Sequence, residues 1–176
     1  MVTFEQIAFT VKNMSEKNDV LRKIRSIANY QFGKSVGERL FPNNVEVVFS
    51  KRTKRIRHIY LEGKRLATLR PTNGMFSLTV AGAERILDGA KRPRLWVKVS
   101  RDATPFVAKG KSVFAKHVFE ADEEIRPLEE VIVLDEKGEI LAVGRAVLTG
   151  AEMKAFKRGI AVRVRWGALE EVKNSK

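Results

Sequence analysis

Apolar residues recur every three or four positions between residues 15 and 32, which is the spacing of a helix that buries one face. The apolar stripe consists of Val20, Leu21, Ile24, Ile27 and Ala28. Lysines and arginines occupy the opposite face, and Gly33 is a typical helix stop. We expect a second short helix at residues 35–40.

Shorter runs follow these helices, and in them apolar and polar residues alternate as is typical of strands. The runs predict strands at residues 45–49, 56–61, 66–69 and 76–80. A weaker alternation at residues 3–12 predicts an edge strand, and residues 82–87 predict a short helix. Two helices that lead into a small antiparallel sheet make an α+β domain.

Residues 88–94 are polar and contain glycine and proline, which marks a boundary between domains. Further strands are predicted beyond it at residues 95–99, 112–118, 131–134, 140–148 and 161–166. Thr149 and Glu152 have the spacing of a capping box, so residues 150–156 should form a short helix. Many short strands with one-turn helices predict a closed, all-β barrel. The two expected domains and a C-terminal tail are residues 1–92, 93–167 and 168–176.

One segment between the predicted strands combines a short helix, a glycine and lysines. Thr104 can cap the helix with its hydroxyl, and Pro105 suits its first turn. Gly110 stands where a helix ends in a left-handed residue, with Lys109 and Lys111 on either side. Such a loop lets a polyanion approach the backbone closely. The alternative is an ordinary helix stop with solvated lysines.

The charge of the chain favours a polyanionic partner. Lys and Arg total 34 against 21 Asp and Glu, which gives a formal net charge of +13. An excess of this size favours a nucleic acid over an anionic membrane surface, and a basic surface without such a partner is the alternative. The sequence has no cysteine and no apolar run of about 20 residues, so we expect a cytoplasmic protein without disulfides or membrane spans.

Two other basic segments are candidate phosphate contacts. Arg163 and Arg165 alternate with apolar residues in the last predicted strand and therefore share one face. Arg52, Lys54 and Arg55 lie in a dense basic run between two predicted strands, where a hairpin loop can track phosphates. A solvated strand face and a solvated turn are the alternatives.

Four segments in the second half of the chain occur in the order found in a known RNA-binding family. They are residues 109–116, 124–127, 143–145 and 156–159. Through them the chain resembles the PUA domain, which is named for pseudouridine synthases and archaeosine transglycosylases. Residues 50–57 and 66–71 extend the resemblance to the pre-PUA plus PUA C-terminal module of archaeal tRNA-guanine transglycosylase. The layout also resembles stand-alone pre-PUA/PUA proteins of translation, such as the malignant T-cell amplified protein family.

This resemblance implies a six-stranded pseudobarrel with short helices. It also implies an RNA-binding face built from the first helix, the glycine loop and the strand after it, with help from the last strand. The contacts implied on this chain are Thr104, Phe106, Gly110, Lys111, Ser112, Lys116, Arg163 and Arg165, to which the chemistry of the loop adds Lys109. The catalytic barrel of the transglycosylases, with its aspartates and zinc site, has no counterpart in the sequence, so no cofactor and no metal are expected.

The remaining candidate residues point to structure rather than catalysis. His58 and His117 lack partners at metal or catalytic spacing and are expected to be structural. Acidic residues concentrate at positions 120–139 without a sign of burial. They predict that the domain has an acidic side, which is turned away from RNA or toward a basic protein partner. Most phenylalanines, Phe114 among them, are assigned to packing.

The leading hypothesis is a non-enzymatic protein that binds structured RNA, with tRNA as the first candidate. It would act as an adaptor or a subunit for an enzyme of tRNA modification. The second hypothesis is a translation factor that binds the small ribosomal subunit together with a protein partner. A third, a small RNA-modifying enzyme, is disfavoured because the sequence shows no catalytic constellation. No membrane partner is expected.

Overall fold

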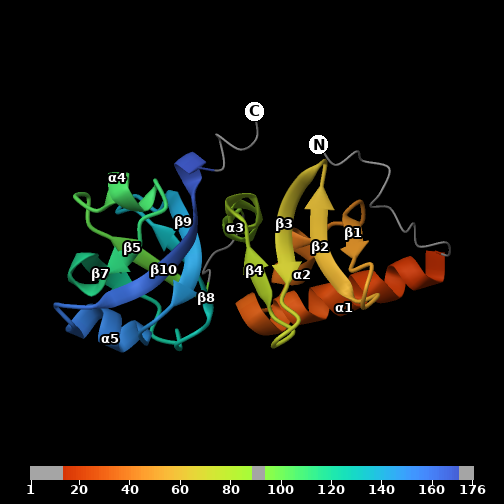
Figure 1. Cartoon of the computed structure of the whole chain (residues 1–176), viewed down its shortest axis with the longest axis horizontal. Helices are drawn as coiled ribbons and strands as arrows, with labels where there is room; N and C mark the ends of the chain where they lie inside the picture. Colours follow the sequence, from red (N-terminus) through yellow and green to blue (C-terminus); the bar gives the residue numbers. More distant parts are fainter. Residues whose placement is uncertain (1–13, 89–93, 171–176) are drawn as a thin grey trace. The chain divides into compact units, whose positions relative to one another are not determined.

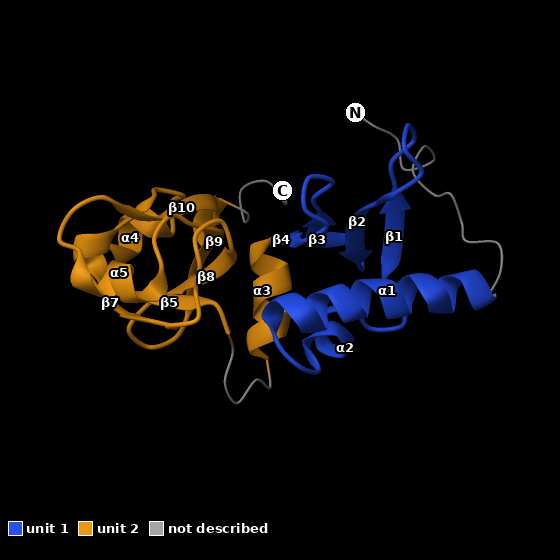
Figure 2. Cartoon of the chain, turned by 90° about the horizontal axis from the view of Figure 1, so that it is seen from below, with its two compact units in different colours: residues 1–77 blue, residues 78–176 orange. Residues whose placement is uncertain are grey.

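The computed structural model describes residues 14–88 and 94–170 of the chain (Figure 1). Their packing divides into two compact units, residues 1–77 and residues 78–176 (Figure 2). The first combines helices with a small sheet, and the second is a six-stranded sheet with short helices. This arrangement confirms the predicted fold class of an α+β part followed by a barrel-like part.

The first unit contains two helices and a four-stranded sheet. The helices are α1 (Met14–Phe32) and α2 (Val36–Leu40). The strands lie side by side in the order β1 (Glu46–Phe49), β2 (Ile56–Leu61), β3 (Lys64–Leu69) and β4 (Phe76–Leu78). The pairs β1–β2 and β2–β3 are antiparallel. The edge strand predicted at residues 3–12 lies outside the described residues.

The apolar stripe of α1 explains how the helix packs in this unit. Leu21, Ile24 and Ala28 are buried, as the periodicity predicted. Gln31 then ties the end of the helix to β4. Its side-chain amide donates to the Phe76 carbonyl at 2.8 Å, and its side-chain oxygen accepts from the Phe76 amide at 2.7 Å. The side chain thereby satisfies both backbone groups of a strand residue.

The second unit begins at Leu78, the last residue of β4, and continues through α3 and six further strands. Its helical segments are α3 (Val80–Leu87), α4 (Thr104–Val107), the 3₁₀ turn η2 (Ala115–His117) and α5 (Gly150–Ala155). Its strands are β5 (Trp96–Val99), β6 (Val113–Phe114), β7 (Val118–Ala121), β8 (Glu130–Leu134), β9 (Ile140–Ala146) and β10 (Ile160–Gly167). They are ordered β6-β10-β9-β8-β5-β7, and β5 pairs with β8 in parallel.

The chain itself closes this sheet into a barrel. The two edge strands, β6 and β7, are consecutive in the sequence and are joined only by η2, Ala115–His117. Three residues span roughly 10 Å at most, so the two edges must curl toward each other. The space inside is filled mainly by small and branched apolar side chains. They include Val97, Val99, Val113, Val131, Val133, Ala142 and Val162.

Two sequence predictions differ from this fold. The strand predicted at residues 112–118 is interrupted by η2, because the chain must turn there to close the barrel. Val80 belongs to α3 rather than to β4, since the Thr79 hydroxyl accepts from the Gly82 amide at 3.2 Å and begins the helix. The packing divides the chain after Ser77, and α3 packs against β9 of the second unit; the domain bounds expected from the sequence stay a prediction.

Other local predictions agree with the structure. Thr149 caps α5 by accepting from the Glu152 amide at 3.2 Å, and the Glu152 carboxylate accepts from the Thr149 amide at 2.8 Å. This is the predicted capping box. Residues 168–170 form a helical turn, and the rest of the predicted tail lies outside the described residues.

His58 should make the stability of the first unit depend on pH. It lies in β2, with Nδ1 2.9 Å from the Thr68 hydroxyl on β3. Burial, followed by the charges of Arg65 and Arg57, lowers the pKa of His58 below its usual value. The unfolded chain therefore binds this proton more readily, so stability that is present above about pH 6.5 is lost as the pH falls toward the folded-state pKa. In urea titrations, the midpoint should fall on acidification from about pH 7 to about pH 5.5, and His58→Gln should reduce that fall. An unchanged pH dependence in the variant would contradict this assignment.

Candidate nucleic-acid interface

The glycine loop after α4 is compact and hydrogen-bonded to itself. Gly110 has a φ of +82°, the left-handed conformation that the sequence predicted. Its amide donates to the Val107 carbonyl at 2.9 Å, and the Lys111 amide donates to the Phe106 carbonyl at 3.1 Å. The backbone therefore reverses within one turn. Lys109 and Lys111 project from the two sides of the glycine and are both exposed.

The start of α4 is held differently from the prediction. The N-cap is Ala103, and Thr104 is the first helical residue, half-buried and not a cap. The predicted hydroxyl cap at Thr104 is therefore wrong. Asp102 stabilises the preceding turn instead, because it accepts from the Ser100 hydroxyl at 2.5 Å and lies 3.2 Å from Nδ1 of His117. The Ser100 hydrogen bond, aided by His117, lowers the pKa of Asp102. This contact gives His117 a structural partner.

The end of β10 packs tightly against the glycine loop. A Cβ at Gly167 would collide with the Ala108 carbonyl and the Gly110 amide nitrogen, so only glycine permits this approach. The Leu169 amide then donates to the same Ala108 carbonyl at 3.0 Å. The chain after β10 therefore fixes the position of the loop.

An acidic side chain lies directly over Gly110. A Cβ built on this glycine would be 2.5 Å from Oε2 of Glu170. The carboxylate thus occupies space that the sequence assigned to an approaching phosphate or ribose. Nothing in the local sequence pattern indicated this contact, because Glu170 lies 60 positions further along the chain.

The surface around the loop combines lysines with exposed aromatic rings. Lys116 lies exposed on η2, and Ser112 is half-buried in the connection to β6. Phe106 on α4 is 62% exposed and Phe114 on β6 is 47% exposed. The assignment of Phe114 to packing is therefore wrong. Val113, Phe114 and Ala115 are all apolar, so no local signal in the sequence distinguished the exposed ring from its buried neighbours.

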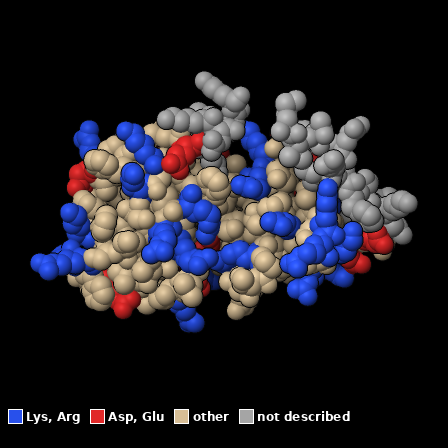
Figure 3. Space-filling model, in the orientation of Figure 1, with Lys and Arg blue, Asp and Glu red and all other residues tan. Residues whose placement is uncertain are grey.

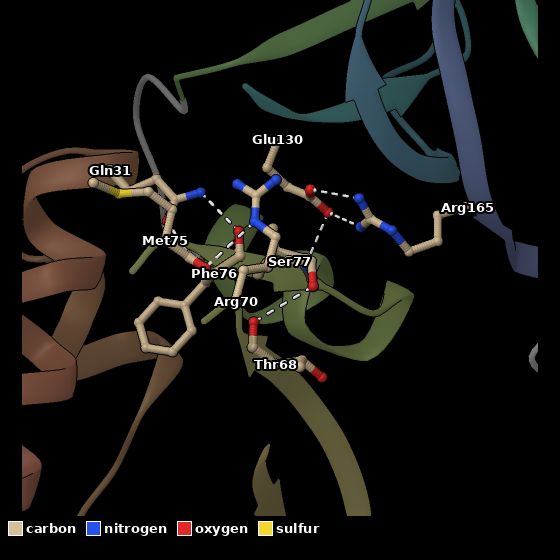
Figure 4. A network of polar contacts seen from close by, with 9 residues as sticks. Gln31, Thr68, Arg70, Met75, Phe76, Ser77, Glu130 and Arg165 are labelled. Atoms are coloured by element: carbon tan, nitrogen blue, oxygen red, sulfur yellow. Dashed lines mark hydrogen bonds and ion pairs between the residues drawn. The ribbon is translucent and has the colours of Figure 1, made fainter. Parts of the chain in front are cut away.

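The two arginines predicted on the last strand have different environments. Arg163 is exposed, whereas Arg165 donates to Glu130 through Nη1 at 2.6 Å and Nη2 at 3.1 Å (Figure 4). Glu130 is fully buried, and its Oε1 also accepts from the Leu78 amide at 2.9 Å. This ion pair engages Arg165 within the fold, and its predicted contact with RNA stays a prediction. The pair corrects the expectation that the acidic run contains no buried carboxylate.

Much of the remaining acidic run is engaged within the fold. Ion pairs join Arg94 to Glu124 at 2.8 Å, Lys98 to Glu120 at 3.0 Å, and Lys154 to Glu123 at 2.7 Å. The Lys154 hydrogen bond and charge lower the pKa of Glu123. In the view of Figure 3, Lys and Arg are spread widely over the surface, and Asp and Glu are fewer.

The predicted basic loop belongs to the first unit. Arg52, Lys54 and Arg55 are exposed in the connection between β1 and β2. The Lys54 amide donates to the Ser50 carbonyl, and the Ser50 amide donates to the Arg55 carbonyl, both at 2.8 Å. This confirms a hairpin loop, and its contact with RNA stays a prediction.

Two features are absent from the described part of the chain. Within residues 14–88 and 94–170, no cluster of three or more His, Asp or Glu side chains could hold a metal ion. None of the helices in the same ranges combines the length and apolar character that a membrane span requires.

Comparison with known proteins identifies the family. Residues 22–93 match the family model described as the patch-forming domain C2 of tRNA-guanine transglycosylase, and residues 95–167 match the PUA domain. The chain is a PUA-domain protein. Its C-terminal part therefore has an RNA-binding fold, which extends from before β5 to the end of β10.

The curated relatives of this PUA-domain protein are archaeal. The chain is 42% identical over 159 residues to a tRNA-guanine(15) transglycosylase of Thermococcus kodakarensis, covering 90% of this chain and 27% of the relative. It is 41% identical over 150 residues to the tRNA-guanine(15) transglycosylase of Methanobrevibacter smithii, covering 85% and 23%. The chain thus spans about a quarter of the length of these relatives.

Two solved structures share most of the architecture. A hypothetical protein, PH0734.1, of Pyrococcus horikoshii has a TM-score of 0.71 at 26% identity, with 90% of this chain and 95% of that chain covered. A conserved PUA domain protein of Thermoplasma acidophilum has a TM-score of 0.62 at 22% identity with the same coverage. At this identity the similarity supports a shared fold only.

The Glu130–Arg165 pair should contribute strongly to folding. Arg165→Met removes the guanidinium and its two hydrogen bonds to a buried carboxylate, so it should lower the free energy of unfolding by about 3 kcal/mol. Arg158→Met removes the same charge from an exposed position and should change it by less than about 0.5 kcal/mol. Urea titrations of both variants test this difference. Equal unfolding midpoints would show that the ion pair is not required.

Proposed function

We propose that this PUA-domain protein binds structured RNA, with tRNA as the first candidate, and has no catalytic activity of its own. The observation that carries the proposal is the exposure of the two lysines that flank a left-handed glycine. Lys109 and Lys111 flank Gly110 on the RNA-binding fold, Lys116 is exposed on η2, and Phe106 is exposed on α4. Lysines attract phosphates without regard to sequence, and exposed aromatic rings can stack on unpaired bases.

The relatives favour tRNA over other RNAs. The curated relatives are named as transglycosylases of a tRNA guanine, and this chain shares 42% identity with a quarter of their length. An adaptor or subunit for an enzyme of tRNA modification is the role that accords with this relationship. Its contribution would be to hold the RNA, because the described surface offers positioning contacts rather than an assembled catalytic site.

Binding should be dominated by phosphate contacts and hence by salt. The net charge of +13 supports a steep loss of affinity as salt rises. Electrostatic attraction of this kind positions an RNA but does not select its sequence. Selection would come from the shape of the RNA and from stacking on exposed rings such as Phe106 and Phe114.

The lysines of the glycine loop should account for part of the salt dependence. Lys111→Glu with Lys116→Glu should weaken tRNA binding and reduce the slope of log affinity against log salt by about 1 for each lysine. Lys137→Glu, in the exposed turn between β8 and β9, is the control with the same kind of charge change. Filter binding over a salt series measures both quantities. If the double variant matches the control in affinity and slope, the glycine loop is not the RNA site.

Glu170 should oppose RNA binding at the same loop. Its carboxylate lies over Gly110, where it repels an incoming phosphate. Glu170→Gln keeps the size of the side chain but removes the charge, so tRNA affinity should rise about threefold, which corresponds to roughly 0.6 kcal/mol. Glu139→Gln, at an exposed position of the β8–β9 turn, is the matched control. Equal affinities for both variants and the native chain would exclude this competition.

A further inference from the structure

Two arginines stand directly opposite each other on neighbouring strands of the second unit. In the antiparallel pair β9–β10, Arg145 is the register partner of Arg163. Both side chains are exposed. Directly opposed residues of an antiparallel pair project from the same face, with Cβ atoms about 5 Å apart. The sheet therefore places two positive charges side by side.

Neighbouring carboxylates do not neutralise this pair. Among the described residues, the side chains of Arg145 and Arg163 form no ion pair or hydrogen bond. Glu130 is the next residue of the same row, as the β8 partner of Arg145. However, its two oxygens are bonded by Arg165, and one of them also accepts from the Leu78 amide. Like charges in opposed positions destabilise a sheet, so this arrangement costs stability when no anion is bound.

The backbone beneath the pair is closely fitted. Gly144 precedes Arg145, and a Cβ at that position would collide with the carbonyl oxygen of Arg163. The register shifts only beyond Val164, so the rows on both sides of Gly144 remain paired. The two guanidinium groups therefore extend from a fixed base and not from a mobile loop. A site on paired strands is held more accurately than a site on loops.

We propose that Arg145 and Arg163 form a clamp for one phosphate group, which we call the β9–β10 clamp. Guanidinium groups bind phosphate oxygens through paired N–H donors, and two of them facing one anion replace mutual repulsion with attraction. The role of the clamp in RNA binding rests on the proposed function. In that role the clamp supplies a phosphate contact in addition to those of the glycine-loop lysines. Its affinity for a phosphate anion does not depend on that role.

The clamp predicts opposite effects on stability and on binding. Arg145→Met should raise the urea midpoint of the free protein at low salt, because it removes the repulsion. Arg163→Glu should raise it as well, because it places opposite charges across the strands. Both changes should weaken tRNA binding, and Arg145→Met should reduce the salt slope by about 1. Arg158→Met, at an exposed position in the connection between α5 and β10, removes the same charge and should leave the urea midpoint unchanged.

Inorganic phosphate tests the clamp without RNA. At constant ionic strength, phosphate in place of chloride should raise the thermal midpoint of the native chain more than that of Arg145→Met, since specific binding stabilises only the folded state. The general stabilisation by phosphate as a kosmotrope remains in both proteins and is removed by the comparison. Arg158→Met should respond as the native chain does.

The outcomes separate the clamp from the proposed function. Loss of the phosphate-specific shift in Arg145→Met supports the clamp even if the native chain binds no tRNA, a result that would overturn the proposed function alone. If tRNA binds and the phosphate shift is the same in Arg145→Met, Arg158→Met and the native chain, the clamp is overturned. A fall of the urea midpoint in both Arg145→Met and Arg163→Glu would also overturn it, because repulsion would then not exist.

Discussion

The buried carboxylate of Glu130 determines how charge is arranged on the outer face of strands β8 to β10. It is fully buried, and the hydrogen bonds that it accepts include two from Arg165 and one from the Leu78 amide. A buried carboxylate needs such partners because its desolvation is costly. Arg165 is therefore required by the fold. With Glu130 satisfied in this way, no carboxylate of that row is left for Arg145 and Arg163.

The second constraint on the structure is that backbone segments must reverse sharply or pack closely at three positions. A glycine occupies each of them. Gly110 adopts a left-handed turn, whereas Gly144 and Gly167 allow neighbouring backbone atoms to come within a distance that a Cβ would prevent. Gly167 packs the end of β10 on the glycine loop, and Gly144 packs β9 on β10. Both candidate phosphate sites therefore stand on rigid backbone, although the side chains that bear the charge are exposed.

The sequence predicted the parts of this fold that local patterns determine. The stripe of α1, the Thr149 capping box and the left-handed Gly110 follow from spacing and residue type, and the structure confirms them. Local patterns do not indicate which distant side chains meet. The partnership of Arg165 with Glu130 and the contact of Glu170 with Gly110 join residues 35 and 60 positions apart. The turn at η2 was missed for a similar reason, because it is imposed by closure of the barrel.

The same limits of local patterns explain why the structure gives some candidate site residues an environment that the sequence did not predict. Arg163 and Arg165 are equivalent in a strand pattern, yet one is exposed and the other is bound to a buried carboxylate. Arg145 belongs to residues 143–145, a segment of the family resemblance, but no pattern in the sequence assigned it a contact with RNA. Only the register of β9 against β10 reveals it opposite a second unneutralised arginine. An arrangement that costs the free protein stability is better explained by an anionic ligand than by folding, since folding alone would favour a charge of opposite sign at either position.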